Sequence, residues 1–193
     1  ENRFTHYTIM DSAQIRSADW CQSVFGDTEG HLWISSFLGG VFRVDKKNLI
    51  AQEGRIYLAE KNYYQNSGRF GLSSNRVQTT ILDKQGNIWA TTNGHGLNKI
   101  DFQADSVVLF AHGQPERNLS SNAISSLFCD TDGYIWVGLT GGLARIDPQT
   151  HEIVSVQNDL LKSKEVLSIT EKDDFLWFTV SDGLFALNKK NHG

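Results

Sequence analysis

The histidines are the side chains best suited to metal binding or acid–base catalysis, but their positions do not indicate a site. The chain of 193 residues contains six of them. They are His6, His31, His95, His112, His151 and His192. Metal-binding histidines recur at short, regular spacings, and these are scattered. A histidine base also needs a nucleophile within reach, and no Gly-x-Ser-x-Gly turn presents one. We therefore predict a non-enzymatic chain with no catalytic residue, metal or cofactor.

Two further motifs that could carry chemistry are weak. Gly94-His95-Gly96 lacks the third glycine of a dinucleotide-binding fingerprint and precedes a strand pattern rather than a helix. Cys21 and Cys129 lie far apart in the chain and form neither a CxxC motif nor a disulfide framework. We expect the cysteines to be small buried residues or free thiols.

Composition argues against several classes of partner. The net charge is −4 at pH 7, and 21% of the residues are charged. No basic face indicates nucleic acid or an anionic membrane, so we predict neither a nucleic-acid partner nor direct membrane contact. The apolar stretch from Ile34 to Val44 is too short to span a bilayer. Because the chain opens with Glu1-Asn2-Arg3 rather than methionine, we expect it to be processed or excised from a longer protein.

Four tryptophans mark an internal repeat. An aspartate lies six residues before each of the first three, and a glycine lies three residues before each. The tryptophans are Trp33, Trp89, Trp136 and Trp177, the aspartates are Asp27, Asp83 and Asp130, and the glycines are Gly30, Gly86 and Gly133. The fourth copy has Glu171 and Asp174 at these positions and is degenerate. Spacings of 56, 47 and 41 residues between the tryptophans are typical of β-propeller blades.

Each repeat predicts four short strands joined by tight turns. Around Trp136 the expected strands are residues 123–129, 134–139, 143–147 and 152–156. An Asp-x-x-Gly turn separates the first two, and Gly141-Gly142 reverses the chain between the second and third. In such a blade, a tryptophan at a fixed place in the second strand packs between neighbouring sheets. The Asp-x-x-Gly turns are accordingly interpreted as structural.

The predicted fold is therefore all-β, a β-propeller of about four four-stranded antiparallel blades. The repeats are expected at about 13–68, 69–115, 116–157 and 158–193, after a last strand of a preceding blade within about 1–12. The first repeat is longer than the others. We expect its fourth strand at about Arg55 to Glu60, followed by a polar loop through Gln65 to Gly68. Phe4 to Ile9 resemble the last strand of a blade whose other strands are missing.

The meander places candidate binding residues on one edge of the blades. The turns after the second strands and the connections between blades share this edge, and the Asp-x-x-Gly turns lie on the other. The position thirteen residues before each aligned tryptophan varies between copies, as expected for a ligand-facing site. The candidates on this edge are Trp20, Arg76, Lys164, Asn75, Asn122, Asn93 and His95. An aromatic ring beside cations and amides suits a saccharide, and the alternative for each is a loop residue that caps backbone groups or meets solvent.

The repeat resembles the two-component regulator propeller repeat. The resemblance rests on the Asp-x-x-Gly-x-Ile/Leu-Trp core, the following Gly-Gly-Leu, and the Leu-Ser-x-Asn-x-Val/Ile lead-in at Leu72–Asn75 and Leu119–Asn122. In that family the repeats build seven-bladed propellers, commonly two in tandem, in the periplasmic sensor region of hybrid two-component systems of gut Bacteroides. The resemblance implies a domain that senses polysaccharide breakdown products and signals through a membrane helix to a histidine kinase.

These observations favour a saccharide-binding segment of a periplasmic sensor. A propeller that serves only protein interaction or dimerisation is the alternative, and a propeller lyase is a more distant one. Four blades with the wedge of a seven-bladed ring do not close, so we expect an open arc. Its exposed blade edges are expected to meet the remaining blades or another copy of the chain.

Overall fold

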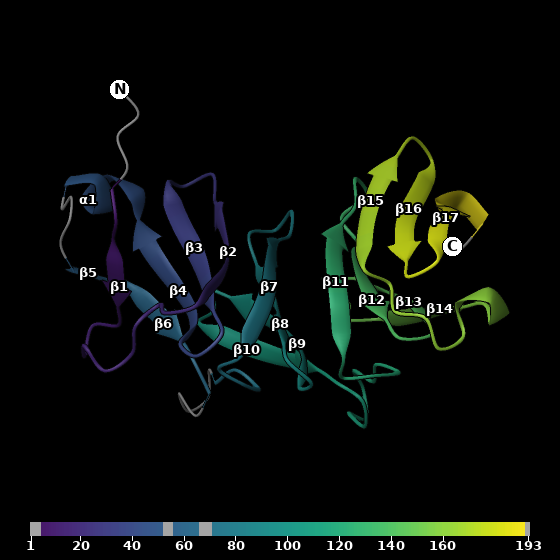
Figure 1. Ribbon diagram of the computed structural model, residues 1–193, viewed down its shortest axis with the longest axis horizontal. Helices are drawn as coiled ribbons and strands as arrows, with labels where there is room; N and C mark the ends of the chain where they lie inside the picture. Colours follow the sequence, from purple (N-terminus) through teal and green to yellow (C-terminus); the bar gives the residue numbers. More distant parts are fainter. Residues whose placement is uncertain (1–4, 52–55, 66–70, 192–193) are drawn as a thin grey trace.

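The described part of the chain forms four antiparallel sheets that follow one another in sequence order. The computed structural model describes residues 5–51, 56–65 and 71–191. Figure 1 shows the sheets side by side along an open arc, with the first and the last sheet at opposite ends. The all-β propeller architecture and the open arc expected from the repeats are confirmed. No helix among the described residues is long and apolar enough to cross a membrane.

The first three sheets are four-stranded, with the strands joined in an antiparallel ladder. Sheet 1 consists of β2 (Cys21–Gly26), β3 (His31–Ser36), β4 (Gly40–Asp45) and β6 (Lys61–Tyr63). Sheet 2 consists of β7 (Val77–Leu82), β8 (Ile88–Thr92), β9 (Gly96–Asp101) and β10 (Ser106–Phe110). Sheet 3 consists of β11 (Ile124–Cys129), β12 (Ile135–Leu139), β13 (Gly142–Ile146) and β14 (Ile153–Gln157). The strands of sheet 3 match the predicted ones to within one residue at every end.

The prediction of four strands is wrong for sheet 4, whose described residues form three strands. The strands are β15 (Ser168–Lys172), β16 (Phe175–Val180) and β17 (Gly183–Asn188). Two short 3-10 helices flank the sheet, η2 (Asp159–Leu161) before it and η3 (Lys189–Asn191) after it. The chain turns into η3 directly after β17, so no fourth strand pairs with that edge in the described part of the chain.

The long insertion of the first repeat differs from the prediction. The fourth strand of sheet 1 is β6, not residues 55–60. The segment before it contains α1 (Lys46–Ala51) and β5 (Ile56–Leu58), and β5 pairs in parallel with β1 (Thr8–Met10). Tyr57 and Ala59 are buried with Phe42 and Val44 of sheet 1. The insertion therefore covers the outer face of sheet 1, and the burial of these apolar side chains stabilises it there.

The segment expected to be the last strand of a preceding blade also differs. Its strand is β1, which pairs in parallel with β5 instead of joining an antiparallel blade. Phe4, the first residue of the expected strand, and the polar loop at residues 66–68 lie outside the described residues.

One hydrogen bond explains the six-residue spacing between aspartate and tryptophan. The indole Nε1 of Trp33, Trp89 and Trp136 donates to Asp27, Asp83 and Asp130 respectively, at 2.9, 2.8 and 2.8 Å. The other carboxylate oxygen of each aspartate accepts backbone N–H groups of its own turn. Each turn is thereby fixed to the adjoining strand, and Gly30, Gly86 and Gly133 take the positive φ that closes it.

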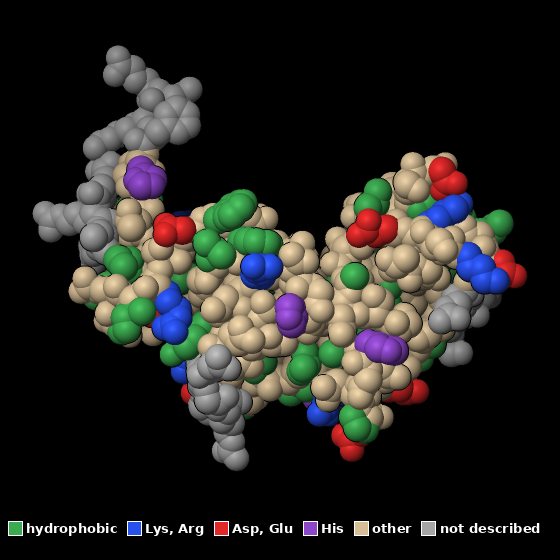
Figure 2. Space-filling model, turned by 60° about the horizontal axis from the view of Figure 1, so that its bottom comes forward, with side chains coloured by type: hydrophobic (Ala, Val, Ile, Leu, Met, Phe, Trp, Pro, Cys, Tyr) green, Lys and Arg blue, Asp and Glu red, His purple; other side chains and the backbone are tan. Residues whose placement is uncertain are grey.

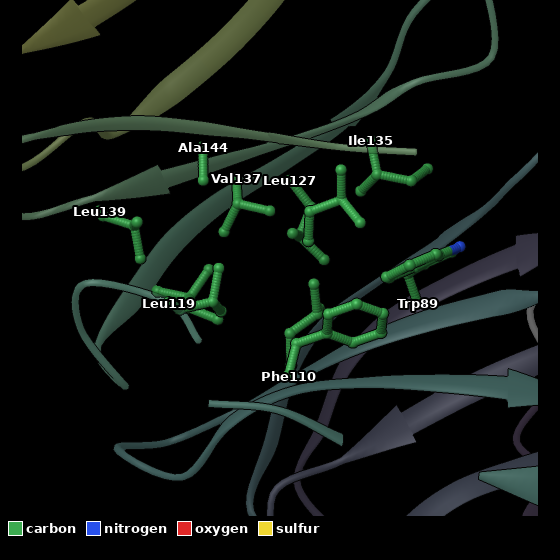
Figure 3. Close-up of a cluster of buried hydrophobic side chains, with 11 residues drawn as sticks. Trp89, Phe110, Leu119, Leu127, Ile135, Val137, Leu139 and Ala144 are labelled. Carbon is green, nitrogen blue, oxygen red and sulfur yellow. The ribbon is translucent and has the colours of Figure 1, made fainter. Parts of the chain in front are cut away.

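The first three framework tryptophans pack between sheets, as predicted. Trp33 lies among residues of sheets 1 and 2, Trp89 among those of sheets 2 and 3, and Trp136 among those of sheets 3 and 4. Figure 3 shows the second of these clusters, in which Trp89 and Phe110 face Leu127, Ile135 and Val137. All three tryptophans are at most 2% exposed.

For Trp177, the prediction that each framework tryptophan packs between two sheets is wrong. It is only partly buried, and it contacts Phe175 of its own strand with the ring centroids 6.2 Å apart. No sheet follows sheet 4 in the described chain, so the face that bears Trp177 is not covered. Six residues before Trp177, where the other repeats have aspartate, the chain has Glu171. The Glu171 carboxylate bonds to Thr131 and Lys189 instead of accepting the indole N–H.

Candidate functional site

The first strands of the sheets line the inner side of the arc. Neighbouring first strands contact each other, β2 with β7, β7 with β11, and β11 with β15. Three backbone bonds join the turn of one blade to the connection of the next: Gly40 donates to Asn75, Gly96 to Asn122 and Gly141 to Lys164, at 3.2, 3.2 and 2.8 Å. The predicted sharing of one edge by these segments is therefore confirmed. We call this side the connection edge.

Three first strands carry a β-bulge at the same place in the repeat. The register shifts between Cys21 and Ser23 in β2, between Val77 and Thr79 in β7, and between Ile124 and Ser126 in β11. The extra residues are Gln22, Gln78 and Ser125. A bulge leaves its extra residue outside the ladder and re-aims the side chain, which is why bulges often adjoin binding sites.

These bulged residues line one groove near the connection edge. The groove has a volume of about 390 Å³ and is lined by residues of β2, β7 and β11 and of the connection that precedes β15. Its lining residues are Gln22, Gln78, Thr79, Asn93, Gly94, Ala123, Ile124, Ser125, Glu165 and Leu167. We call it the channel groove. Figure 2 turns this edge forward and shows the outline of the molecule hollowed between the two ends of the arc.

An exposed aromatic platform lies on the connection edge of sheet 1. Trp20 is 67% exposed and contacts Phe37, with the ring centroids 5.2 Å apart. The Arg76 guanidinium from the next blade lies 5.7 Å from the same Phe37 ring. Trp20 has a φ of +55°, a conformation that bulky residues rarely adopt. The structure thus brings together Trp20 and Arg76, two of the candidates predicted from the sequence, and Phe37 lies between them.

The other predicted site residues divide into one groove residue and several structural ones. Asn93 lines the channel groove. The Oδ1 atoms of Asn75 and Asn122 accept the backbone N–H of Gln65 and His112, at 2.6 and 2.7 Å. These two asparagines therefore hold the connecting loops, as the structural alternative expected.

His95 and Lys164 already have partners within the chain. The His95 ring lies 2.6 Å from the Asn93 carbonyl. The Lys164 ammonium pairs with Asp182 at 2.8 Å, and this hydrogen bond holds the pKa of the Asp182 carboxyl below its ordinary value. Neither residue is among those that line the channel groove.

Sequence reasoning missed Gln22, Gln78, Ser125 and Glu165. The first three stand eleven residues before their tryptophans, so the repeat alignment contained a polar signal in three copies. Regular alternation along a strand does not reveal which residue is bulged, and the bulge decides that these side chains face the groove.

A larger depression of about 770 Å³ lies at the opposite edge of the arc. It is lined by turn residues that the framework already uses, among them Asp83, Asp130 and Glu171. Glu171 is tied to Lys189, and Lys84 to the backbone of Thr131. Because its polar groups serve the framework, we regard the channel groove as the better candidate site.

Among the residues that the structure describes, two groups have a geometry that could hold a metal ion, and they share His31. One group is Asp27, Glu29 and His31, and the other is His31, Asp45 and Glu60. The buried Arg43 guanidinium lies against the same atoms, 2.9 Å from the His31 ring and 3.1 Å from Glu60. It also lies 3.9 Å from the Phe102 ring of the next blade. The arginine supplies positive charge here, so the cluster works as a link between sheets 1 and 2.

The aligned repeats match a known family model. The model is that of the two-component regulator propeller, and it matches residues 71–94 and 118–141. Both matches run from the lead-in segment through the bulge, the Asp-x-x-Gly turn and the tryptophan to the following glycine turn. The chain carries two-component regulator propeller repeats.

Solved structures extend the likeness of these propeller repeats over almost the whole chain. The extracellular domain of a hybrid two-component system from B. thetaiotaomicron is 32% identical, with a TM-score of 0.85 over 97% of this chain and 25% of that one. The same values hold for a structure described as the extracellular domain of a one-component system from that bacterium. This chain therefore spans a quarter of the length of those domains.

More distant structures share the fold of the propeller repeats. A second hybrid two-component system of B. thetaiotaomicron is 19% identical, with a TM-score of 0.68 over 95% of this chain and 23% of that one. Virginiamycin B lyase from Staphylococcus aureus is 15% identical, with a TM-score of 0.60 over 87% of this chain and 55% of that one. None of the curated proteins matches the sequence significantly.

Proposed function

We propose that this chain is part of the extracytoplasmic ligand-sensing domain of a hybrid two-component regulator, and that it binds a saccharide-type signal in the channel groove. The likeness to extracellular domains of such systems supports the location and the sensor role. The signal passes to a histidine kinase elsewhere in the receptor, as a shift between two states of the sensor.

The groove is the observation that carries the saccharide proposal. Three bulged strands present hydrogen-bonding side chains at equivalent places, and Asn93 adds a further amide. Amide and hydroxyl groups both donate to and accept from sugar hydroxyls. The aromatic platform of Trp20 and Phe37, on the same edge, offers a face on which a pyranose ring stacks.

Calorimetry of the intact extracytoplasmic domain against a panel of oligosaccharides tests this proposal. We expect at least one oligosaccharide to bind, and Gln22→Ala or Gln78→Ala to weaken its binding about tenfold, the loss of one or two hydrogen bonds. Gln149→Ala, an exposed glutamine outside the groove, is the matched control and keeps the wild-type affinity. Silence across the panel, or equal affinity in all variants, contradicts the proposal.

A protein-interaction module is the second candidate, favoured by the uncovered face of sheet 4. In that case the propeller serves dimerisation, and the ligand binds elsewhere. Trp20→Ala and Arg76→Ala separate the two functions in the full receptor. Loss of signalling in these variants supports sensing, and full signalling in both supports scaffolding. A lyase would need histidines with acidic groups at the groove, and the lining residues include no histidine.

A further inference from the structure

The channel groove is lined by several neutral polar side chains and by one acidic side chain. The lining carries the amides of Gln22, Gln78 and Asn93 and the hydroxyl groups of Thr79 and Ser125. Glu165 is the single ionisable residue among the lining residues. Neither Lys164 nor Arg76 is among the lining residues: the Lys164 ammonium pairs with Asp182, and the Arg76 guanidinium lies over the Phe37 ring. The groove lining therefore presents one negative charge and no positive charge to a ligand.

Glu165 is held in place by its backbone and by one side-chain bond. Its backbone forms an isolated antiparallel bridge with Thr140, the residue that follows β12. The next residue, Val166, donates to the Leu139 carbonyl at 3.4 Å. One carboxylate oxygen accepts the Ser125 hydroxyl at 2.6 Å. The side chain is nevertheless exposed, so its second oxygen is free to accept a hydrogen bond from a ligand.

We infer that the channel groove selects an uncharged, hydroxyl-rich saccharide over an acidic one, and that Glu165 enforces this selection. The inference rests on the proposed function and names the ligand class of the same site. A carboxylate accepts hydrogen bonds from sugar hydroxyls, whereas a uronate carboxylate beside it is repelled. At a separation of about 5 Å near a protein surface, like charges disfavour each other by about tenfold or more in affinity.

Matched ligand pairs test the inference. The probes are gluco- and galacto-oligosaccharides and their uronate counterparts of equal length and linkage, titrated into the intact extracytoplasmic domain at low salt. We expect a neutral member to bind about tenfold tighter than its uronate counterpart. Raising the salt reduces this ratio, because exposed charges are screened.

Variants at Glu165 assign the effect to this residue. Glu165→Gln is expected to bring the neutral-to-uronate ratio to within about twofold, while Glu165→Asp, which keeps the charge, retains most of the preference. Glu152→Gln replaces an exposed glutamate outside the groove and leaves the ratio unchanged. Preference of the wild type for uronates, or an unchanged ratio in Glu165→Gln, overturns the inference while the sensing proposal stands. Absence of binding by both members of every pair overturns the sensing proposal and this inference with it.

Discussion

At the scale of single residues, the aspartate of each repeat joins two parts of a blade. In Asp27 one carboxylate oxygen accepts the backbone N–H groups of Glu29 and His31, and the other accepts the indole of Trp33. Burial raises the pKa of this carboxyl, but the hydrogen bonds donated to it outweigh burial and leave the pKa below its ordinary value. The ionised form is therefore the one that the fold stabilises.

Asp27→Asn is expected to make the stability of the chain less dependent on pH. A carboxyl with a lowered folded pKa contributes stability above its unfolded pKa of about 3.9, and this contribution is lost as the pH falls through the folded pKa. The free energy of urea unfolding, measured at pH 7 and near pH 3, should fall less in Asp27→Asn than in the wild type. The exposed Asp173→Asn should follow the wild type. An equal fall in the wild type and Asp27→Asn would refute the assignment.

At the scale of elements, the sheets are held together by what lies between them. Each buried tryptophan belongs to one sheet and packs on the next. The recurring positions of the repeat therefore stabilise the contacts between blades as well as the blade itself. Sheet 1 is covered on its outer face by β1, β5 and α1, with Ile9, Leu49 and Tyr57 in the cluster. Sheet 4 has no such cover in the described chain.

Replacing the framework tryptophan by alanine should therefore lower the free energy of unfolding by different amounts in sheets 3 and 4. Trp136→Ala opens a cavity between sheets 3 and 4 and leaves Asp130 without its indole partner, so we expect a loss of about 3–5 kcal/mol in the free energy of unfolding. Trp177→Ala removes a partly exposed side chain without this bond, and we expect a loss of about 1 kcal/mol or less. Chemical denaturation of the two variants measures the difference, and similar losses would contradict the packing described.

At the scale of the whole molecule, the two end sheets of the arc differ. The outer face of sheet 1 is covered by other segments, whereas the corresponding face of sheet 4 is uncovered in the described chain. The face of sheet 4 exposes Phe175 by 38% and Leu184 by 63% beside Trp177. Uncovered apolar faces of this kind are typical of surfaces that meet another protein surface. In the isolated chain, the available surface is the same face of a second copy, which gives a self-complementary contact.

We predict that the isolated 193-residue chain self-associates through sheet 4. Its apparent mass in light scattering should rise with concentration, and Leu184→Glu should return it to a monomer, because the contact would bury a charge. Leu160→Glu changes an equally exposed leucine in η2 and should leave the association intact. A compact monomer at all concentrations would exclude this contact.

The sequence alone determined the parts of the protein that depend on local pattern. A blade is built from neighbouring strands and tight turns, so the recurrence of aspartate, glycine and tryptophan was enough to predict the order of the four sheets, the strands of sheet 3, the shared edge and the packing of Trp33, Trp89 and Trp136. The face to which Trp20 and Arg76 belong followed from the same meander.

Tertiary structure decided what depends on register and on distant neighbours. A bulge of one residue turns Gln22, Gln78 and Ser125 toward the groove, and no alternation pattern marks the bulged position. The pairing of β1 with β5 joins segments from separate parts of the chain, and its reason is the apolar face of sheet 1 that they bury. Trp177 has the same place in its strand as the other tryptophans, but its burial depends on whether another sheet packs against it.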